Sequence, residues 1–295
     1  MDVLWFGLGA VALLLAALAC FAWRWASRLM ARRTADEEAS PSDHGLAYQD
    51  VCFTSRDGIT LRGWFIPGAA ARCAVIFCHG HGGSMDPDVI YAPWLHQAGF
   101  SVLMFDFRAH GRSDGERVSM GYLERQDLLG AVDFLRQRGI DRLGVLGFSM
   151  GGAVAMSTAP HSEAIRAVIS DGGFARLENA LLGWSSRRRN LPSWLTLPLT
   201  RLVIAVAGWR LGGRLPEADP IRWVGRIAPR PLLLIHGDRD VYVTVKDVQA
   251  LYQAAGEPKE LWRVAEAEHR RVDRVRPDEY RERVVGFFRR HLLSS

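Results

Sequence analysis

A serine between two glycines is the residue of this chain best suited to covalent chemistry. Residues 147–151 read Gly-Phe-Ser-Met-Gly; they follow the apolar run 143–146 and precede a stretch of small residues. A serine on a sharp turn between a strand and a helix needs almost no side-chain bulk two residues to either side, and Gly147 and Gly151 meet that need. The pattern therefore predicts a nucleophile elbow that exposes the Ser149 hydroxyl above the end of a strand.

A serine hydroxyl is a poor nucleophile at neutral pH, so it needs a base, and the base needs a third group to hold its tautomer. In enzymes built on such an elbow, the acid and then the histidine follow the serine along the chain. The apolar run 232–235 leads into a turn with two carboxylates, and we expect Asp240 rather than Asp238 because it lies further past the strand end. Only His269 and His291 come later, and His291 falls near the end of the last expected helix. The sequence therefore predicts His269 as the base.

The oxyanion of a tetrahedral intermediate needs hydrogen-bond donors. One expected donor is the backbone amide of Met150, directly after the nucleophile. The second is expected in residues 79–83, His-Gly-His-Gly-Gly, where glycines let the backbone approach a ligand, and we assign it to the amide of His81. The ring of His81 either reaches the substrate or packs against its neighbours.

Neither a metal nor an organic cofactor is expected. The histidines, cysteines and acidic residues lack the spacing of a metal site, and no glycine-rich phosphate loop opens a helix.

Apolar runs alternate with stretches of helical periodicity, which indicates how these side chains are positioned. Continuous apolar runs are typical of strands that are covered on both faces. The expected strands are residues 51–54, 61–66, 74–78, 102–105, 143–146, 167–169 and 232–235, and the expected helices are 122–138, 245–255 and 278–293. This alternation predicts a mostly parallel sheet with helices on both faces.

One stretch, from about residue 176 to residue 223, breaks the alternation. It is rich in leucine, tryptophan and arginine and is interrupted by three prolines. We expect a cap inserted over the site, whose apolar side chains either line an acyl pocket or touch a membrane surface. The alternative is that this stretch merely packs on the sheet.

An uncharged apolar run at residues 3–23 is long enough, as a helix, to cross a hydrocarbon core of about 30 Å. No basic residue precedes the run, whereas a cleaved signal peptide would have a basic start, so we expect an uncleaved single-pass anchor. Positive charge after the run places the catalytic part on the cytoplasmic side of the membrane, and a bacterial inner membrane is the expected location. The arginines that follow the run are Arg24, Arg28, Arg32 and Arg33.

The expected organisation is an anchor with a basic flank at 1–33, a polar linker at 34–47 and one large domain at 48–295. With 295 residues and 48% hydrophobic content, the chain can bury a full core. Its net charge of +5 comes almost entirely from arginine, and no element resembles one that reads nucleic acid, so no nucleic-acid partner is expected.

Taken together, the motifs resemble the α/β-hydrolase superfamily, from about residue 48 to the C-terminus. The chain looks most like its membrane-anchored esterase or serine-aminopeptidase-like branch. The resemblance implies an α/β-hydrolase fold with an eight-stranded sheet, and acyl transfer to water without a cofactor. Before His269, Glu268 stands where the family often has a glycine. The matching pieces are residues 79–83, 105–111, 147–151, 236–240 and 268–269.

We therefore expect a serine hydrolase of carboxylic esters, carboxylesterase- or lipase-like, acting through an acyl-enzyme. Its expected partners are a small acyl ester with a hydrophobic or lipid-like acyl group, and the membrane. A serine peptidase or a thioesterase would use the same three residues. A catalytically silent domain of this fold that binds a ligand or a partner protein is the alternative from a different class.

Overall fold

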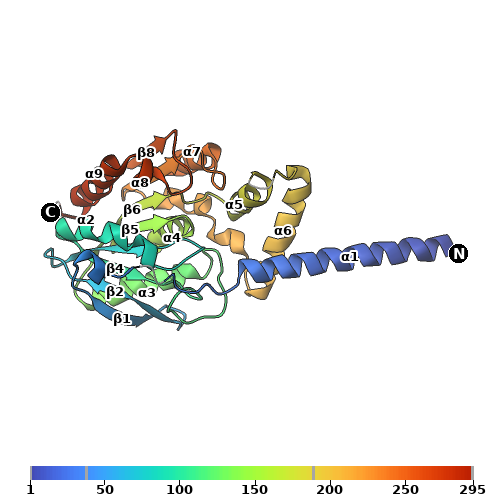
Figure 1. Cartoon of the computed structure of the whole chain (residues 1–295), viewed down its shortest axis with the longest axis horizontal. Helices are drawn as coiled ribbons and strands as arrows, with labels where there is room; N and C mark the ends of the chain where they lie inside the picture. Colours follow the sequence, from blue (N-terminus) through green and yellow to red (C-terminus); the bar gives the residue numbers. More distant parts are fainter. Residues whose placement is uncertain (1, 37–38, 188–189, 294–295) are drawn as a thin grey trace.

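A central eight-stranded sheet organises the molecule (Figure 1). The computed structural model describes residues 2–36, 39–187 and 190–293. The strand order is β1-β2-β4-β3-β5-β6-β7-β8; β2 runs antiparallel to both of its neighbours, and all other pairs are parallel. This confirms the predicted fold class. The strands are β1 (Gln49–Thr54), β2 (Thr60–Ile66), β3 (Cys73–Cys78), β4 (Ser101–Phe105), β5 (Arg142–Phe148), β6 (Ile165–Asp171), β7 (Leu232–Gly237) and β8 (Lys259–Val264).

Helices cover both faces of the sheet, and each face has its own apolar core. Successive residues of a strand point to opposite faces, so in β3 Ala74 and Ile76 join one core while Val75 and Phe77 join the other. The first core includes α3 (Glu124–Gln137), α4 (Met150–Thr158) and α7 (Val245–Ala254); the second includes α2 (Ala92–Gln97), α8 (Val272–Val275) and α9 (Pro277–Phe288). This two-sided burial explains why the strands read as continuous apolar runs.

The loops that follow the parallel strands converge at one edge of the sheet. Residue 79 follows β3, residue 149 follows β5, residue 240 lies just beyond β7 and residue 269 beyond β8. Parallel strands end at the same edge, so this topology brings together residues far apart in the sequence.

The predicted cap lies between β6 and β7. It consists of α5 (Leu177–Leu182), a π-helical turn at Gly183–Arg187, α6 (Ser193–Arg210) and short 3-10 turns. Residues 188–189 of the cap lie outside the described residues, as do residues 37–38 of the predicted linker. The predicted domain boundaries stay predictions.

The first helix, α1 (Asp2–Leu29), projects from the body with the N-terminus at its far end (Figure 1). Within the described residues one helical stretch, Trp5–Leu29, is long and apolar enough to cross a membrane, a property that a signal sequence shares. Its last turns pack against α6 and the domain, so Ala22, Ala26 and Met30 are buried. The helix is therefore exposed at its N-terminal end and part of the folded body at its C-terminal end.

Candidate active site

Ser149 occupies the turn between β5 and α4, where the nucleophile elbow was predicted. Its backbone has a positive φ of 51°, with ψ −112°, a combination that non-glycine residues rarely adopt. A Cβ at Gly151 would overlap the carbonyl oxygen of Cys78, and one at Gly147 would overlap the backbone of Gly151. The two glycines are thus required because the strand, the turn and the neighbouring loop approach each other at backbone distance.

Ser149, His269 and Asp240 form one hydrogen-bonded chain. Nε2 of His269 lies 2.9 Å from the Ser149 hydroxyl oxygen, and Nδ1 lies 2.5 Å from Oδ2 of Asp240. A carboxylate can only accept, so Nδ1 carries the proton and Nε2 presents its lone pair to the hydroxyl. The arrangement can move a proton from the serine to the histidine.

The two carboxylates of the turn after β7 have different partners. The second oxygen of Asp240 accepts the backbone amides of Tyr242 and Val243, at 2.7 Å and 2.9 Å. Asp238 instead forms a partly exposed ion pair with Arg263, at 2.6 Å. The structure thus brings Asp240, and not Asp238, to the His269 ring. The other downstream histidine, His291, packs on the ring of Phe287.

The two residues predicted to supply oxyanion donors line the same pocket as Ser149. Met150 is the first residue of α4, and His81 lies in the loop after β3, next to Gly80. A Cβ at Gly80 would be 3.5 Å from the Ser149 side chain, so this loop passes directly beside the nucleophile. The His81 carbonyl is 3.2 Å from Nε2 of the buried His110 ring, which helps to fix the loop.

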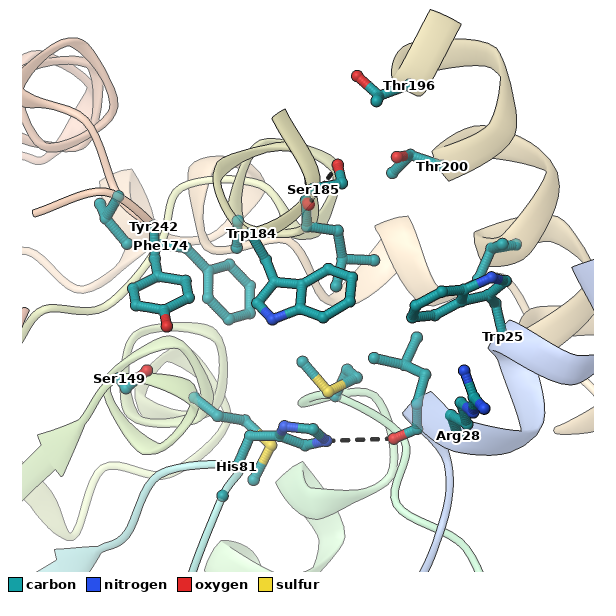
Figure 2. Close-up of a pocket in the computed structure, with 18 of the residues that line it drawn as sticks. Trp25, Arg28, His81, Ser149, Phe174, Trp184, Ser185, Thr196, Thr200 and Tyr242 are labelled. Carbon is teal, nitrogen blue, oxygen red and sulfur yellow. Dashed lines mark hydrogen bonds between the residues drawn. The ribbon is translucent and has the colours of Figure 1, made fainter. Parts of the chain in front are cut away.

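The ring of His81 contacts the end of α1. Its Nε2 lies 3.1 Å from the carbonyl oxygen of Leu29 (Figure 2). The same nitrogen lies 3.2 Å from the Arg33 guanidinium. Burial, together with the charge of Arg33, lowers the pKa of His81 to about 4, so the ring is neutral near pH 7. The loop that was expected to bind the oxyanion is therefore joined to the N-terminal helix.

Arg270 was not singled out in the sequence, and it secures the segment that carries His269. Its guanidinium pairs with Asp88 and lies over the ring of Phe148, 4.4 Å from the ring centroid. The nearby Asp171 is fully enclosed; burial raises its pKa to about 6, and it accepts a hydrogen bond from the Tyr280 hydroxyl at 2.8 Å. In the sequence, the only sign of this role is that Arg270 directly follows the candidate base His269. The partners of Arg270 become visible only in the fold.

Ser149 and His269 open into a pocket of about 1040 Å³ between the sheet edge, the cap and α1. Figure 2 shows Ser149 and Tyr242 at one end, Trp184 in the middle and Trp25 at the other end. The cap contributes mostly leucine, tryptophan and valine side chains, so the walls are largely apolar.

The last turns of α1 form part of this pocket, which was not predicted from the sequence. The available signal was the placement of Ala22 and Ala26 four residues apart, followed by Met30 after four more. This spacing marks one helical face on which small residues permit close packing.

Comparisons with known proteins agree with this architecture. Residues 74–199 match a family model described as the alpha/beta hydrolase fold. The uncharacterised protein YfhR of Escherichia coli (strain K12) is 32% identical over 252 residues, which cover 81% of this chain and 80% of that protein. A thiohydrolase of Aspergillus aculeatus, aneE, is 36% identical over 201 residues, covering 64% of this chain and 60% of that protein.

Among solved structures, the chain is similar to the Pyrococcus furiosus esterase Pf2001. The TM-score is 0.75 at 30% identity, over 89% of this chain and 98% of the esterase. The similarity therefore extends well beyond the residues matched by the family model.

Proposed function

This chain belongs to the α/β-hydrolase superfamily, and we propose that it is a serine hydrolase that cleaves carboxylic esters through an acyl-enzyme. The observation that carries the proposal is the continuous chain from the Ser149 hydroxyl through the His269 ring to the Asp240 carboxylate, at one end of an apolar pocket. The likeness to an esterase structure supports the same reaction class.

In the first half of the reaction, the Ser149 oxygen attacks the ester carbonyl carbon while Nε2 of His269 takes the hydroxyl proton. Asp240 holds Nδ1–H, so the ring keeps the required tautomer and its positive charge is stabilised. The amides of Met150 and His81 donate to the oxyanion; the loss of one such donor typically costs about 2.7–4 kcal/mol of barrier.

The intermediate then collapses, and the carbon–oxygen bond to the leaving alcohol breaks. His269 returns its proton to the leaving oxygen, which releases the alcohol and leaves the acyl group on Ser149. A water molecule next attacks the acyl carbon as His269 takes a proton from it. In the second collapse the bond between the acyl carbon and the Ser149 oxygen breaks, and His269 returns its proton to that oxygen. This releases the carboxylic acid and restores the serine hydroxyl.

The pocket favours hydrophobic or lipid-like acyl groups. The cap side chains Leu181, Trp184, Leu199 and Val203 form an apolar wall beyond the nucleophile. Burying each methylene of an acyl chain there contributes about 0.8 kcal/mol. We therefore expect catalytic efficiency to rise from acetyl to medium-chain esters.

Thioesters are the second candidate substrate. The specific observation that favours them is the similarity to aneE, a protein named a thiohydrolase. Attack by Ser149 on a thioester carbonyl would use the same donors and the same base, with a thiol as the leaving group.

We further propose that α1 is retained as a membrane anchor and that the domain lies on the cytoplasmic side. The free end of α1 exposes large apolar side chains, including Trp5, Phe6 and Leu13, at 66–78% of their surface. Its last turns line the pocket, so cleavage after the apolar run would remove part of the pocket wall. The ring of Trp23 lies 6.4 Å from that of Trp209 on α6, and tryptophan is enriched at membrane interfaces.

Labelling with a fluorophosphonate probe tests the proposal on the full chain in neutral detergent. We expect the wild-type protein to react and to hydrolyse p-nitrophenyl esters, and Ser149→Ala to lose both, with a rate loss of at least about 10³-fold. Ser157→Ala is the matched control, because this buried hydroxyl on α4 donates only to carbonyls of its own helix. Labelling that persists in Ser149→Ala would remove the nucleophile assignment, and a complete lack of Ser149-dependent turnover would favour a binding protein.

A further inference from the structure

Two arginines in the pocket wall have no carboxylate partner among the residues that the structure describes. We infer that Arg28 and Arg33 bind an anionic oxygen group, a phosphate or a carboxylate, carried by the substrate. This inference rests on the proposed function and names its substrate class: an acyl ester that is both hydrophobic and anionic.

Arg33 is half-buried beside the loop that passes Ser149. Its Nη2 donates to the carbonyl of Arg28 at 3.2 Å and lies 3.2 Å from Nε2 of His81. Its Nε is buried and has no hydrogen-bond partner. Within the part of the chain that the structure describes, Arg33 forms no ion pair, and the neutral His81 ring offers no negative charge. The guanidinium therefore has a donor that no described residue uses, beside the His81 ring in the wall of the pocket.

Arg28 lies one turn earlier, near the C-terminal end of α1. Its guanidinium is 5.2 Å from the centroid of the Trp25 ring, and Figure 2 shows both residues at the end of the pocket opposite Ser149. Arg28 likewise makes no ion pair with any described residue. Stacking on an aromatic ring leaves the edge of a guanidinium free to donate to an anion.

Two other arginines of this region differ from Arg28 and Arg33 in their partners, although the Nε of Arg270, like that of Arg33, is buried without a hydrogen-bond partner. Arg270, in the same pocket wall, pairs with Asp88. Arg32, next to Arg33 in the sequence, donates to three backbone carbonyls of the loop at residues 111–115. Among the described residues that line the pocket there is no aspartate or glutamate, so none of them balances the charge of Arg28 and Arg33.

Arg33 is half-buried, where a charge without a counter-ion is costly, and an anion from the ligand would compensate it. Arg28 is exposed, and its charge would add attraction for the same anion. Guanidinium groups donate in a planar fork that matches carboxylate and phosphate oxygens. With the ester carbonyl at Ser149, the acyl chain can follow the apolar cap while the anionic group reaches the α1 side. A cationic group at that position would be repelled.

The test uses pairs of esters that differ only in the anion, with the full chain in neutral detergent. One pair is 1-decanoylglycerol and 1-decanoylglycerol 3-phosphate; the other is p-nitrophenyl hexanoate and its ω-carboxylate derivative. We expect the wild type to favour the anionic member of at least one pair by about tenfold or more in kcat/KM. The pair that shows the preference identifies the side of the ester on which the anion lies.

Arg33→Gln and Arg28→Gln should each lower this preference, mainly by raising KM for the anionic ester. Arg33→Lys, which retains the charge, should lower it less and guards against misfolding of the glutamine variant. Arg24→Gln removes an exposed charge of the same helix outside the pocket and should leave the preference unchanged.

Equal rates on both members of both pairs, with Ser149-dependent turnover intact, would overturn the inference and leave the proposed function standing. A preference that survives both glutamine variants would also overturn it. The inference would also be overturned if the glutamine variants lost binding to phosphatidylglycerol vesicles but kept the preference for the anionic ester, because the arginines would then bind lipid headgroups rather than the substrate. If no ester is turned over, the proposed function fails, and binding of 1-O-decylglycerol 3-phosphate against 1-O-decylglycerol, followed by tryptophan fluorescence, still decides the inference.

Discussion

At the scale of single residues, the site depends on how the two oxygens of one carboxylate are used. Oδ1 of Asp240 accepts two backbone amides, and Oδ2 accepts Nδ1–H of His269. The backbone amides therefore hold the Asp240 side chain in place independently of the His269 ring, and Asp240 in turn orients the ring toward Ser149. Asp238, two residues earlier, holds Arg263 at the surface and has no such relation to the histidine.

Replacing the Asp240 carboxylate by an amide tests its role in orienting His269. Asp240→Asn keeps the shape but supplies an amide that can donate to Nδ1, which favours the wrong tautomer of His269. We expect kcat for p-nitrophenyl butyrate to fall about 10³- to 10⁴-fold with little change in the circular dichroism spectrum.

Asp238→Asn is the control for that variant. It removes a partly exposed ion pair and should change stability by less than about 1 kcal/mol and leave kcat within about twofold. Similar losses in the two variants would show that Asp240 has no special relation to the reaction.

At the scale of elements, the nucleophile is displayed by a turn with no room for side chains. The backbone at Gly151, at the start of α4, touches the end of β3, and Ser149 adopts a positive φ to connect β5 to the helix. Packing at backbone distance fixes the position of the hydroxyl more firmly than a side-chain contact would, and strained backbone of this kind is typical of functional sites.

Gly151→Ala should therefore damage the elbow. Its Cβ would overlap the backbone of Cys78, and moving either element costs about 3 kcal/mol, which corresponds to a fall in Tm of about 6–12 °C. Fluorophosphonate labelling should be lost together with this stability.

Gly286→Ala provides the comparison within a helix. Its Cβ would have only the Arg290 side chain nearby, at 3.5 Å, so we expect a change of at most about 1 kcal/mol, on the stabilising side. Full labelling of Gly151→Ala with an unchanged Tm would contradict the proposed role of the turn.

At the scale of the whole molecule, α1 has two parts with different surroundings. Its N-terminal part exposes apolar side chains away from the body, whereas its C-terminal turns bury Ala22, Ala26 and Met30 and line the pocket (Figure 1). The helix therefore links the membrane that we propose it crosses to the loop containing His81, through the Leu29 carbonyl.

Two truncations separate these parts. Deletion of residues 2–20 should release the protein from membranes but retain its fold and its reaction with fluorophosphonate. Deletion of residues 2–33 should also uncover the core that Met30 covers; this side chain alone contributes about 2 kcal/mol, so we expect Tm to fall by at least about 4 °C. The ratio of medium- to short-chain ester hydrolysis should fall as well, because one wall of the pocket is lost.

The measurements are carbonate extraction of membranes, differential scanning fluorimetry and ester kinetics, with intact mass of the full-length protein as a check on processing. A mature protein that begins near residue 20 would contradict a retained anchor. Equal stability of the two truncated proteins would contradict the role of the C-terminal turns.

The sequence by itself determined the features that local chain geometry and reaction chemistry impose. The glycines around Ser149 predicted the elbow because no larger residue fits there, and the apolar runs predicted the strands because both sheet faces are covered. Chain order and elimination led to the prediction of His269, and the position further past the strand end led to that of Asp240. Helix ends were less well determined: the expected helix at 278–293 ends as α9 at residue 288, followed by a π-helical turn, because terminal turns depend on their packing.

Only the tertiary structure decided what surrounds the reacting residues. His81 meets Leu29 across 52 positions of sequence, and Arg270 meets Asp88 across 182. Nothing local in the chain encodes such contacts, because they arise when parallel strands end at one sheet edge and a helix from outside the sheet closes over it. The apolar run of α1 predicted a membrane segment, but its role as a pocket wall, with Arg28 and Arg33 lining the pocket and forming no ion pair with any described residue, follows from packing alone.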